Sequence, residues 1–177
     1  MTKQFTLNHL TLAALALAIS AAAGSAAAAV ATATSTSTVV TPINITKGSD
    51  LAFGSFAAGA TIGTVTVSPN GTRAVSGGVI QMGGSPTAAR FDVTGQSGMN
   101  YSITFGGSTQ LNDGGSNNMT FTRISDVTAS AITTGNVSAG TLTAGAQSIY
   151  VGGVLTVGAS QAPGTYTGTV IASVDYN

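Results

Sequence analysis

The feature that most constrains the fold is an alternation of side-chain character that recurs along the chain and is clearest at its C-terminal end. In the closing GTYTGTVIASVDYN, the apolar side chains of Val170, Ala172 and Val174 share one parity with Tyr166 and Tyr176, while Thr, Ser and Asp mostly occupy the other. A period of two places these sets on opposite faces of a β-strand. The alternation therefore predicts a final strand with one buried face.

Similar segments, separated by turn signals, fill the chain after residue 34. Asn-Gly at 70–71 and Asp-Gly at 113–114 are typical of tight turns, and Gly-Gly at 152–153 predicts a bulge or turn within a strand. No stretch after residue 28 has a helical period. About eight or nine short strands predict an all-β fold, an Ig-like β-sandwich. The predicted strands are 35–45, 51–56, 63–67, 72–80, 89–94, 101–105, 119–127, 148–157 and 165–176.

Two segments are interpreted less directly. Residues 47–50 (Lys-Gly-Ser-Asp) predict a turn, and residues 128–146, rich in small and polar side chains, are either a weak strand pair or an insertion without regular structure. The core is expected to form from inward positions on neighbouring strands. These are Phe91, Val93, Tyr101, Ile103, Phe105, Phe121, Ile149, Val151, Val154 and Leu155.

Residues 1–28 have the features of a secretory signal peptide. Lys3 supplies the positive start, residues 12–19 form a short apolar run, and small residues with A-x-A-like cleavage sites follow near 26–31. The apolar run is short for a membrane span, so a retained anchor is the weaker alternative. The sequence predicts an exported mature chain with one domain over 29–177 and no membrane span. Its location would be the periplasm, the outer-membrane surface or the extracellular space.

The residue types after residue 28 exclude most kinds of catalytic and metal chemistry. This part has no His, Cys or Glu, and its four scattered basic residues face five Asp, for a net charge of −1. A Ser-His-Asp site is excluded, and zinc or copper sites lack their usual ligands. Loop 112–118 offers oxygen atoms but not the spacing or terminal Glu of an EF-hand, so it is interpreted as a hairpin loop. We expect no enzyme activity, no cofactor, no metal site and no nucleic-acid binding.

Several short motifs, taken in order, carry a family resemblance. They are VTPINI from Val40, LAFG from Leu51, RFDVTG from Arg90, YSI from Tyr101, VGGVLTV from Val151, and GTYTGT from Gly164 running on to VDYN. In this order they resemble the family known as domain of unknown function 4402, over nearly the whole mature chain. More distantly they resemble the spore coat protein U domain and the archaic chaperone–usher pilins.

The resemblance implies an Ig-like sandwich, export across a bacterial inner membrane and a surface or fimbrial role. It brings no catalytic residues with it. One departure is clear: the pilins of the wider group usually carry a disulfide near the first strand, and this chain has no Cys.

Residues 29–40 alternate regularly and have no obvious partner nearby in the sequence, so they are a candidate donor strand. In strand donation, an extended segment of one subunit completes the sheet of the next. The partners would be further copies of this chain, or a periplasmic chaperone and usher. The candidate strand-exchange interface is Ala31, Ala33, Ser35, Ser37, Val39, Val170, Val174 and Tyr176.

The small side chains of this segment argue for an alternative. An Ala or Ser contributes far less on burial than a Leu or Ile, so the segment could instead be the sandwich's own first strand. The protein would then be a monomeric binding or adhesion module of the periplasm or cell surface.

Overall fold

The computed structural model describes residues 28–177 in two units, which divide after Thr38. The leader predicted over residues 1–28 lies outside the described residues except for Ala28. Residues 28–38 contain no strand, and all their side chains are exposed. The second unit, Val39–Asn177, is a β-sandwich of two antiparallel sheets, so the predicted all-β sandwich is confirmed.

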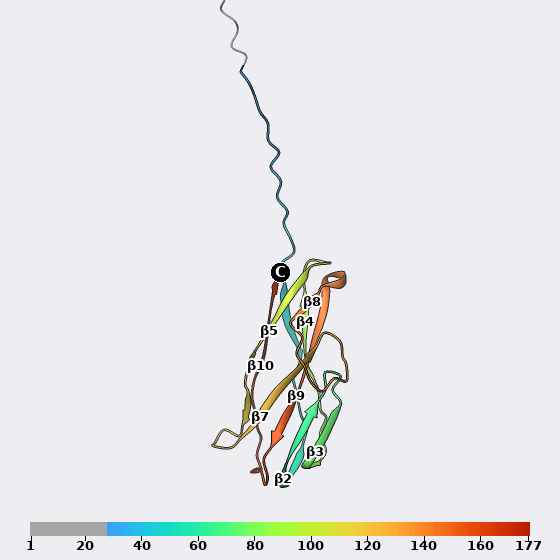
Figure 1. Cartoon of the computed structure of the whole chain (residues 1–177), viewed down its shortest axis with the longest axis vertical. Helices are drawn as coiled ribbons and strands as arrows, with labels where there is room; N and C mark the ends of the chain where they lie inside the picture. Colours follow the sequence, from blue (N-terminus) through green and yellow to red (C-terminus); the bar gives the residue numbers. More distant parts are fainter. Residues whose placement is uncertain (1–27) are drawn as a thin grey trace, which may run out of the picture. The chain divides into compact units, whose positions relative to one another are not determined.

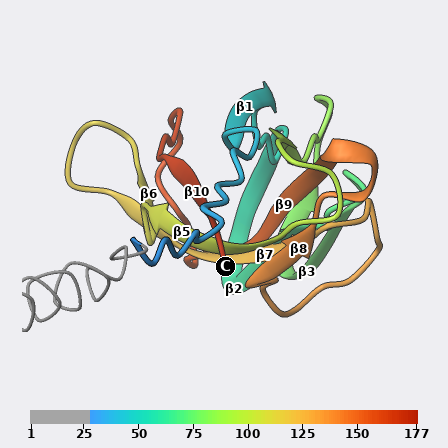
Figure 2. The ribbon, with the colours of Figure 1, turned by 90° about the horizontal axis from the view of Figure 1, so that it is seen from above.

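Ten strands make up this sandwich. The large sheet has the order β1-β4-β9-β2-β3, with β7 also paired to β9 and β6 paired to β7; the small sheet has the order β10-β5-β8. Figure 2 shows β10 and β5 on one side of the domain and β9, β2 and β3 on the other. The bounds are β1 Asn44–Ser49, β2 Phe56–Val67, β3 Arg73–Gln81, β4 Ala89–Thr94, β5 Asn100–Gly107, β6 Gln110–Asn112, β7 Asn118–Asp126, β8 Ala139–Thr141, β9 Ala146–Val157 and β10 Val170–Tyr176.

Strand β9 is the centre of the large sheet. One of its edges pairs first with β4 and then with β2, while its other edge pairs with β7 without a break. The bulge or turn predicted at 152–153 is therefore wrong. These glycines instead allow close approach, because a Cβ at Gly152 would meet the carbonyl of Val67, and one at Gly153 would meet the ring of Phe121.

Two groups of buried side chains form the core. One group joins β4 and β9 of the large sheet to β5 and β10 of the small sheet, through side chains such as Val93, Tyr101 and Ile149. The other lies where β2, β3, β7 and β9 meet, and includes Val65, Phe121 and Leu155. Of the ten predicted inward positions, eight are buried and Phe105 is half-buried against the first group; Val154 is on the outer face, opposite Thr66 and Thr122.

Other differences from the predicted strands are local. The strand expected over 35–45 begins only at Asn44: residues 35–38 are Ser and Thr, and the side chains of Val39 and Val40 are exposed. The turn expected at 47–50 is mostly strand, since β1 runs to Ser49. The strand expected over 51–56 is reduced to a single bridge at Ala52, and the final strand begins at Val170. Segment 128–146 contains β8 and a short 3-10 turn.

Arg123 joins the two sheets. From β7 its Nη1 donates to the carbonyl of Gly106 on β5 at 2.7 Å, and its guanidinium lies 5.0 Å from the centre of the Phe105 ring. Hydrogen bonds from a charged donor and cation–π contacts are both stabilising when partly shielded from water. One side chain thus fixes the small sheet against the large one.

Substituting Gly153→Ala should destabilise the sandwich by about 1–3 kcal/mol, because the new methyl group would overpack the Phe121 ring and lie 2.8 Å from the carbonyl oxygen of Thr122. Gly106→Ala is the matched control on β5, where the nearest heavy atom to the new Cβ is 3.8 Å away. Urea unfolding measures both free energies. Equal effects of the two substitutions would contradict the packing described for β9.

Candidate functional site

An open groove of about 740 Å³ lies on the surface of the sandwich. Its first wall is residues 51–58, the connection after β1 with the start of β2, and its second wall is residues 161–170, which lead into β10. In Figure 1, β10 runs up to the C-terminus at one end of the domain, and β2 and β3 are labelled at the opposite end. The groove therefore lies where the small sheet stops and the large sheet continues.

The floor of the groove is apolar. Phe121, Met119 and Leu155 are buried beneath it, and Phe53 packs edge-on against Phe121 with ring centres 6.0 Å apart. Leu111 and Val170 complete the lining as partly buried residues. No Lys, Arg or Asp is among the residues that line the groove. An occupant with apolar, uncharged side chains suits such a surface.

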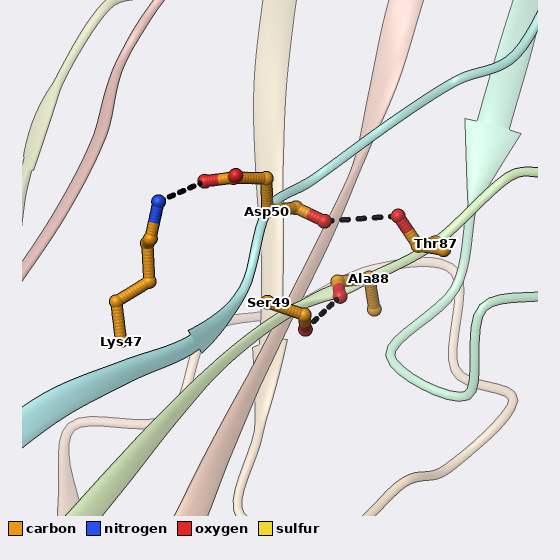
Figure 3. Close-up of polar contacts among 5 residues, drawn as sticks. All are labelled: Lys47, Ser49, Asp50, Thr87 and Ala88. Atoms are coloured by element: carbon orange, nitrogen blue, oxygen red, sulfur yellow. Dashed lines mark hydrogen bonds and ion pairs between the residues drawn. The ribbon is translucent and has the colours of Figure 1, made fainter.

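The first wall is fastened to the chain just before β4, as Figure 3 shows. Ser49 donates its hydroxyl to the carbonyl of Ala88 at 2.9 Å, and Thr87 donates to the carbonyl of Asp50 at 2.9 Å. Lys47 and Asp50 form an exposed ion pair at 2.8 Å, which adds little stability on its own. These contacts fix the point where the chain leaves β1 and enters the wall.

The second wall is braced from the side away from the groove. The amide of Thr167 donates to the carbonyl of Asn112 at 2.8 Å, and the carbonyl of Thr167 accepts from the amide of Asn112 at 2.9 Å. The carbonyl of Thr169 accepts from the amide of Ser108 at 2.8 Å. Earlier in the same wall, the Tyr166 hydroxyl donates to the carbonyl of Ala162 at 2.8 Å. The wall is thus extended, and its outward hydrogen bonds are already made.

Both walls also present backbone groups without backbone partners. Within the described residues, the amides of Leu51, Phe53, Tyr166 and Gly168 make no hydrogen bond to another backbone group, and the carbonyls of Leu51, Tyr166 and Gly168 accept none. In an extended chain, successive residues point their amides and carbonyls to opposite sides. Because Ala52 and Thr167 bond outward, the backbone groups of Leu51, Tyr166 and Gly168 point towards the groove. An unpaired strand edge therefore borders the groove on the second wall, and a shorter one borders it on the first.

The comparison with known families agrees with the sequence motifs. The model of the family described as "Domain of unknown function (DUF4402)" matches residues 43–176, nearly the whole sandwich. The chain belongs to the DUF4402 family. No curated protein matches it. Among residues 28–177, no helix has the length and apolar character needed to cross a membrane.

Only part of the predicted strand-exchange set lies at the groove of this DUF4402 domain. Val170 lines it. Val174 and Tyr176 instead pack into the core group between the sheets. The remaining predicted residues belong to the N-terminal segment and are exposed: Ala31, Ala33, Ser35, Ser37 and Val39.

Tyr176, at the C-terminal end of β10, forms hydrogen bonds away from the groove. Its hydroxyl donates to the carbonyl of Thr41 at 2.8 Å and accepts from the amide of Gln96 at 2.6 Å. Gln96 Oε1 in turn accepts from the hydroxyl of Thr41 at 3.2 Å. A Cβ at residue 95 would collide with the Tyr176 hydroxyl, so this contact requires Gly95. The start of the sandwich is therefore fixed to the end of its last strand.

Loop 112–118, whose oxygen atoms were considered for metal binding, connects the hairpin of β6 and β7. Asp113 lies between β6 and β7 and accepts from the Asn117 side chain at 2.6 Å and from the Gly115 amide at 2.8 Å. These hydrogen bonds lower the pKa of the Asp113 carboxyl. Its oxygens brace their own loop. Within residues 28–177, no three acidic, His or Cys side chains gather as metal ligands would.

Amide hydrogen exchange in the monomer should alternate along the second wall. The amides of Thr167 and Thr169 are hydrogen-bonded, the latter to the Ser108 hydroxyl at 3.0 Å, whereas those of Tyr166 and Gly168 face the groove. We expect protection factors at least about tenfold higher for the Thr pair. NMR-detected exchange measures each amide. Uniform protection over 165–169 would show that the groove edge is not open.

Proposed function

We propose that this protein is an exported structural subunit that assembles by β-strand donation, in which residues 29–40 of a second copy fill the groove. The observation that carries the proposal is the pair of unpaired strand edges above an apolar floor. An added strand gains its affinity from main-chain hydrogen bonds on such edges and its specificity from alternate side chains. A surface or fimbrial assembly outside the cytoplasm is the role that follows, with no enzyme activity.

The charge of the proposed donor fits the groove. Residues 28–43 contain no charged side chain, and neither does the groove lining. Burial of an unpaired charge in such a place would cost several kcal/mol. The side chains of the donor therefore enter without desolvation of charge.

The geometry of the sandwich favours donation between copies. Thr41, from which the segment continues, is held by Tyr176 at the end of β10, whereas the groove lies before the start of β10. The seven residues of β10 separate these points by roughly 20 Å. To fill its own groove the chain would have to reverse direction, yet residues 39–43 contain no turn, and Pro42 favours an extended Thr41.

The small side chains of the donor limit the strength of the assembly. Residues 31–37 offer Ala and Ser on one parity and Thr on the other, so apolar burial adds little and pairing of the backbone carries the affinity. A periplasmic chaperone with bulkier side chains would be able to occupy the groove before assembly. This makes an exported chaperone and usher the natural partners of the proposal.

A second candidate function uses the same groove. Its volume falls in the range of pockets that bind small molecules, and such pockets are mostly apolar with a few polar groups. A monomeric binding module of the periplasm or cell surface is therefore the alternative. The oligomeric state of the chain separates the two functions.

Deletion of residues 29–40 should convert the mature chain from assemblies to monomers, because the donor is lost while the groove remains. Size-exclusion chromatography with light scattering measures this, and a synthetic peptide of residues 29–40 should bind the shortened chain. Monomers both with and without the segment would overturn strand donation and favour the binding module.

A charge placed in the donor gives a sharper test. Ser35→Asp puts a carboxylate on the parity proposed to face the groove and should reduce assembly at least about 100-fold, since an unpaired buried charge costs several kcal/mol. Thr36→Asp is the matched control, with the same charge on the opposite face. Both positions are exposed in the single chain, so neither substitution should alter the thermal unfolding of the monomer. Equal assembly of the two variants would contradict insertion with this parity.

A further inference from the structure

Arg73, at the start of β3, lies behind the first wall of the groove and contacts its backbone. Nη1 of the guanidinium donates to the carbonyls of Phe53 at 2.9 Å and Ser55 at 3.2 Å, and Nη2 donates to the carbonyl of Met82 at 2.7 Å. These three carbonyls belong to two different connections, β1–β2 and β3–β4. One side chain thus gathers both connections onto the edge of the large sheet.

The backbone of the wall is shaped around this side chain. Gly54 has φ +71°, in the left-handed region that favours glycine. A Cβ at this position would also meet Arg73 Nη1. The glycine therefore serves both the turn of the wall and the approach of the guanidinium.

The contacts of Arg73 decide which way the wall's hydrogen-bonding groups point. The carbonyls of Phe53 and Ser55 bond to the guanidinium and the Ser55 amide bonds to the carbonyl of Gly83 at 3.0 Å, whereas the amide of Phe53 makes no hydrogen bond to another backbone group. Without the guanidinium, the carbonyls of Phe53 and Met82 would need new partners, while the carbonyl of Ser55 would keep only the amide of Met82 at 3.1 Å. A preordered edge binds a strand more tightly because less entropy is lost on binding.

We propose that Arg73 is the positioning residue of the groove: it holds residues 53–55 in the conformation that accepts an incoming strand. This inference rests on the proposed function for its ligand, the strand 29–40 of a second copy. Arginine is the side chain suited to the task, because its planar fork carries several donors in fixed directions, whereas lysine is a flexible point charge.

The test uses the mature chain carrying Ser35→Asp, which keeps the protein monomeric with its groove empty, and a fluorescent peptide of residues 29–40 as the probe. Arg73→Ala should raise the dissociation constant of the peptide at least about tenfold, and Arg73→Lys should restore only part of the loss. In the absence of peptide, the amides of Ser55 and Met82 should exchange at least about tenfold faster in Arg73→Ala. Amides in the β4–β9 pairing should exchange as before.

Two controls separate positioning from general stability. Arg90→Ala removes an exposed arginine that pairs with Asp92 on β4 at 3.1 Å, and should leave peptide binding unchanged. Val93→Ala removes buried volume in the core group distant from the groove, and supplies a variant of lowered thermal stability. If Val93→Ala weakens peptide binding as much as Arg73→Ala at an equal loss of thermal stability, the positioning role is overturned.

The outcomes also separate this inference from the function on which it rests. Full peptide affinity in Arg73→Ala, or unchanged exchange at Ser55 and Met82, would overturn the inference alone. Failure of the chain with Arg73 intact to bind the peptide would overturn strand donation, and with it the strand-accepting role of Arg73. Weaker binding with faster exchange confined to the wall would support both.

Discussion

The pairing of β9 with three other strands is the constraint on which the rest of the sandwich depends. Because β9 holds β4 and β2 on one edge and β7 on the other, the large sheet extends beyond the small one. The small sheet covers it only as far as Val170, where β10 begins. Beyond that point the core side chains of β2, β7 and β9 are flanked by two connections rather than by strands, and the groove is the result.

Much of this fold could be predicted from side-chain alternation, because strands that bury one face must alternate. The predicted segments 89–94 and 148–157 agree closely with β4 and β9. Alternation failed for residues 35–43: residues 35–38 are Ser and Thr, Val39 and Val40 are exposed, and only Ile43 packs against the core. The turn-forming residue types at 47–50 also misled, because β1 continues to Ser49, where the neighbouring β4 supplies a partner.

The groove could not be predicted in the same way, because it depends on residues that are distant in the sequence. The motifs LAFG and GTYTGT contain most of the unpaired edges and were interpreted as strands, yet a strand and an unpaired strand edge have the same local pattern. Whether Phe53 or Gly168 has a partner is decided by what lies opposite. The link between Arg73 and Phe53 likewise spans 20 residues, and an isolated arginine in a β-strand gives no sign of it.

The use of two of the domain's few cations, Arg73 and Arg123, on backbone carbonyls has a consequence for how the protein behaves in solution. Their charges are turned inward, so strand β3, RAVSGGVIQ, forms an outer edge of the large sheet with no outward-facing charge and with Ile80 exposed. Proteins commonly guard such edges with lysine or other charges. Here nothing electrostatic opposes contact between molecules at this edge, and with a formal charge near zero the protein gains little colloidal protection from repulsion. Contact between molecules at this edge should therefore depend on protein concentration more than on ionic strength.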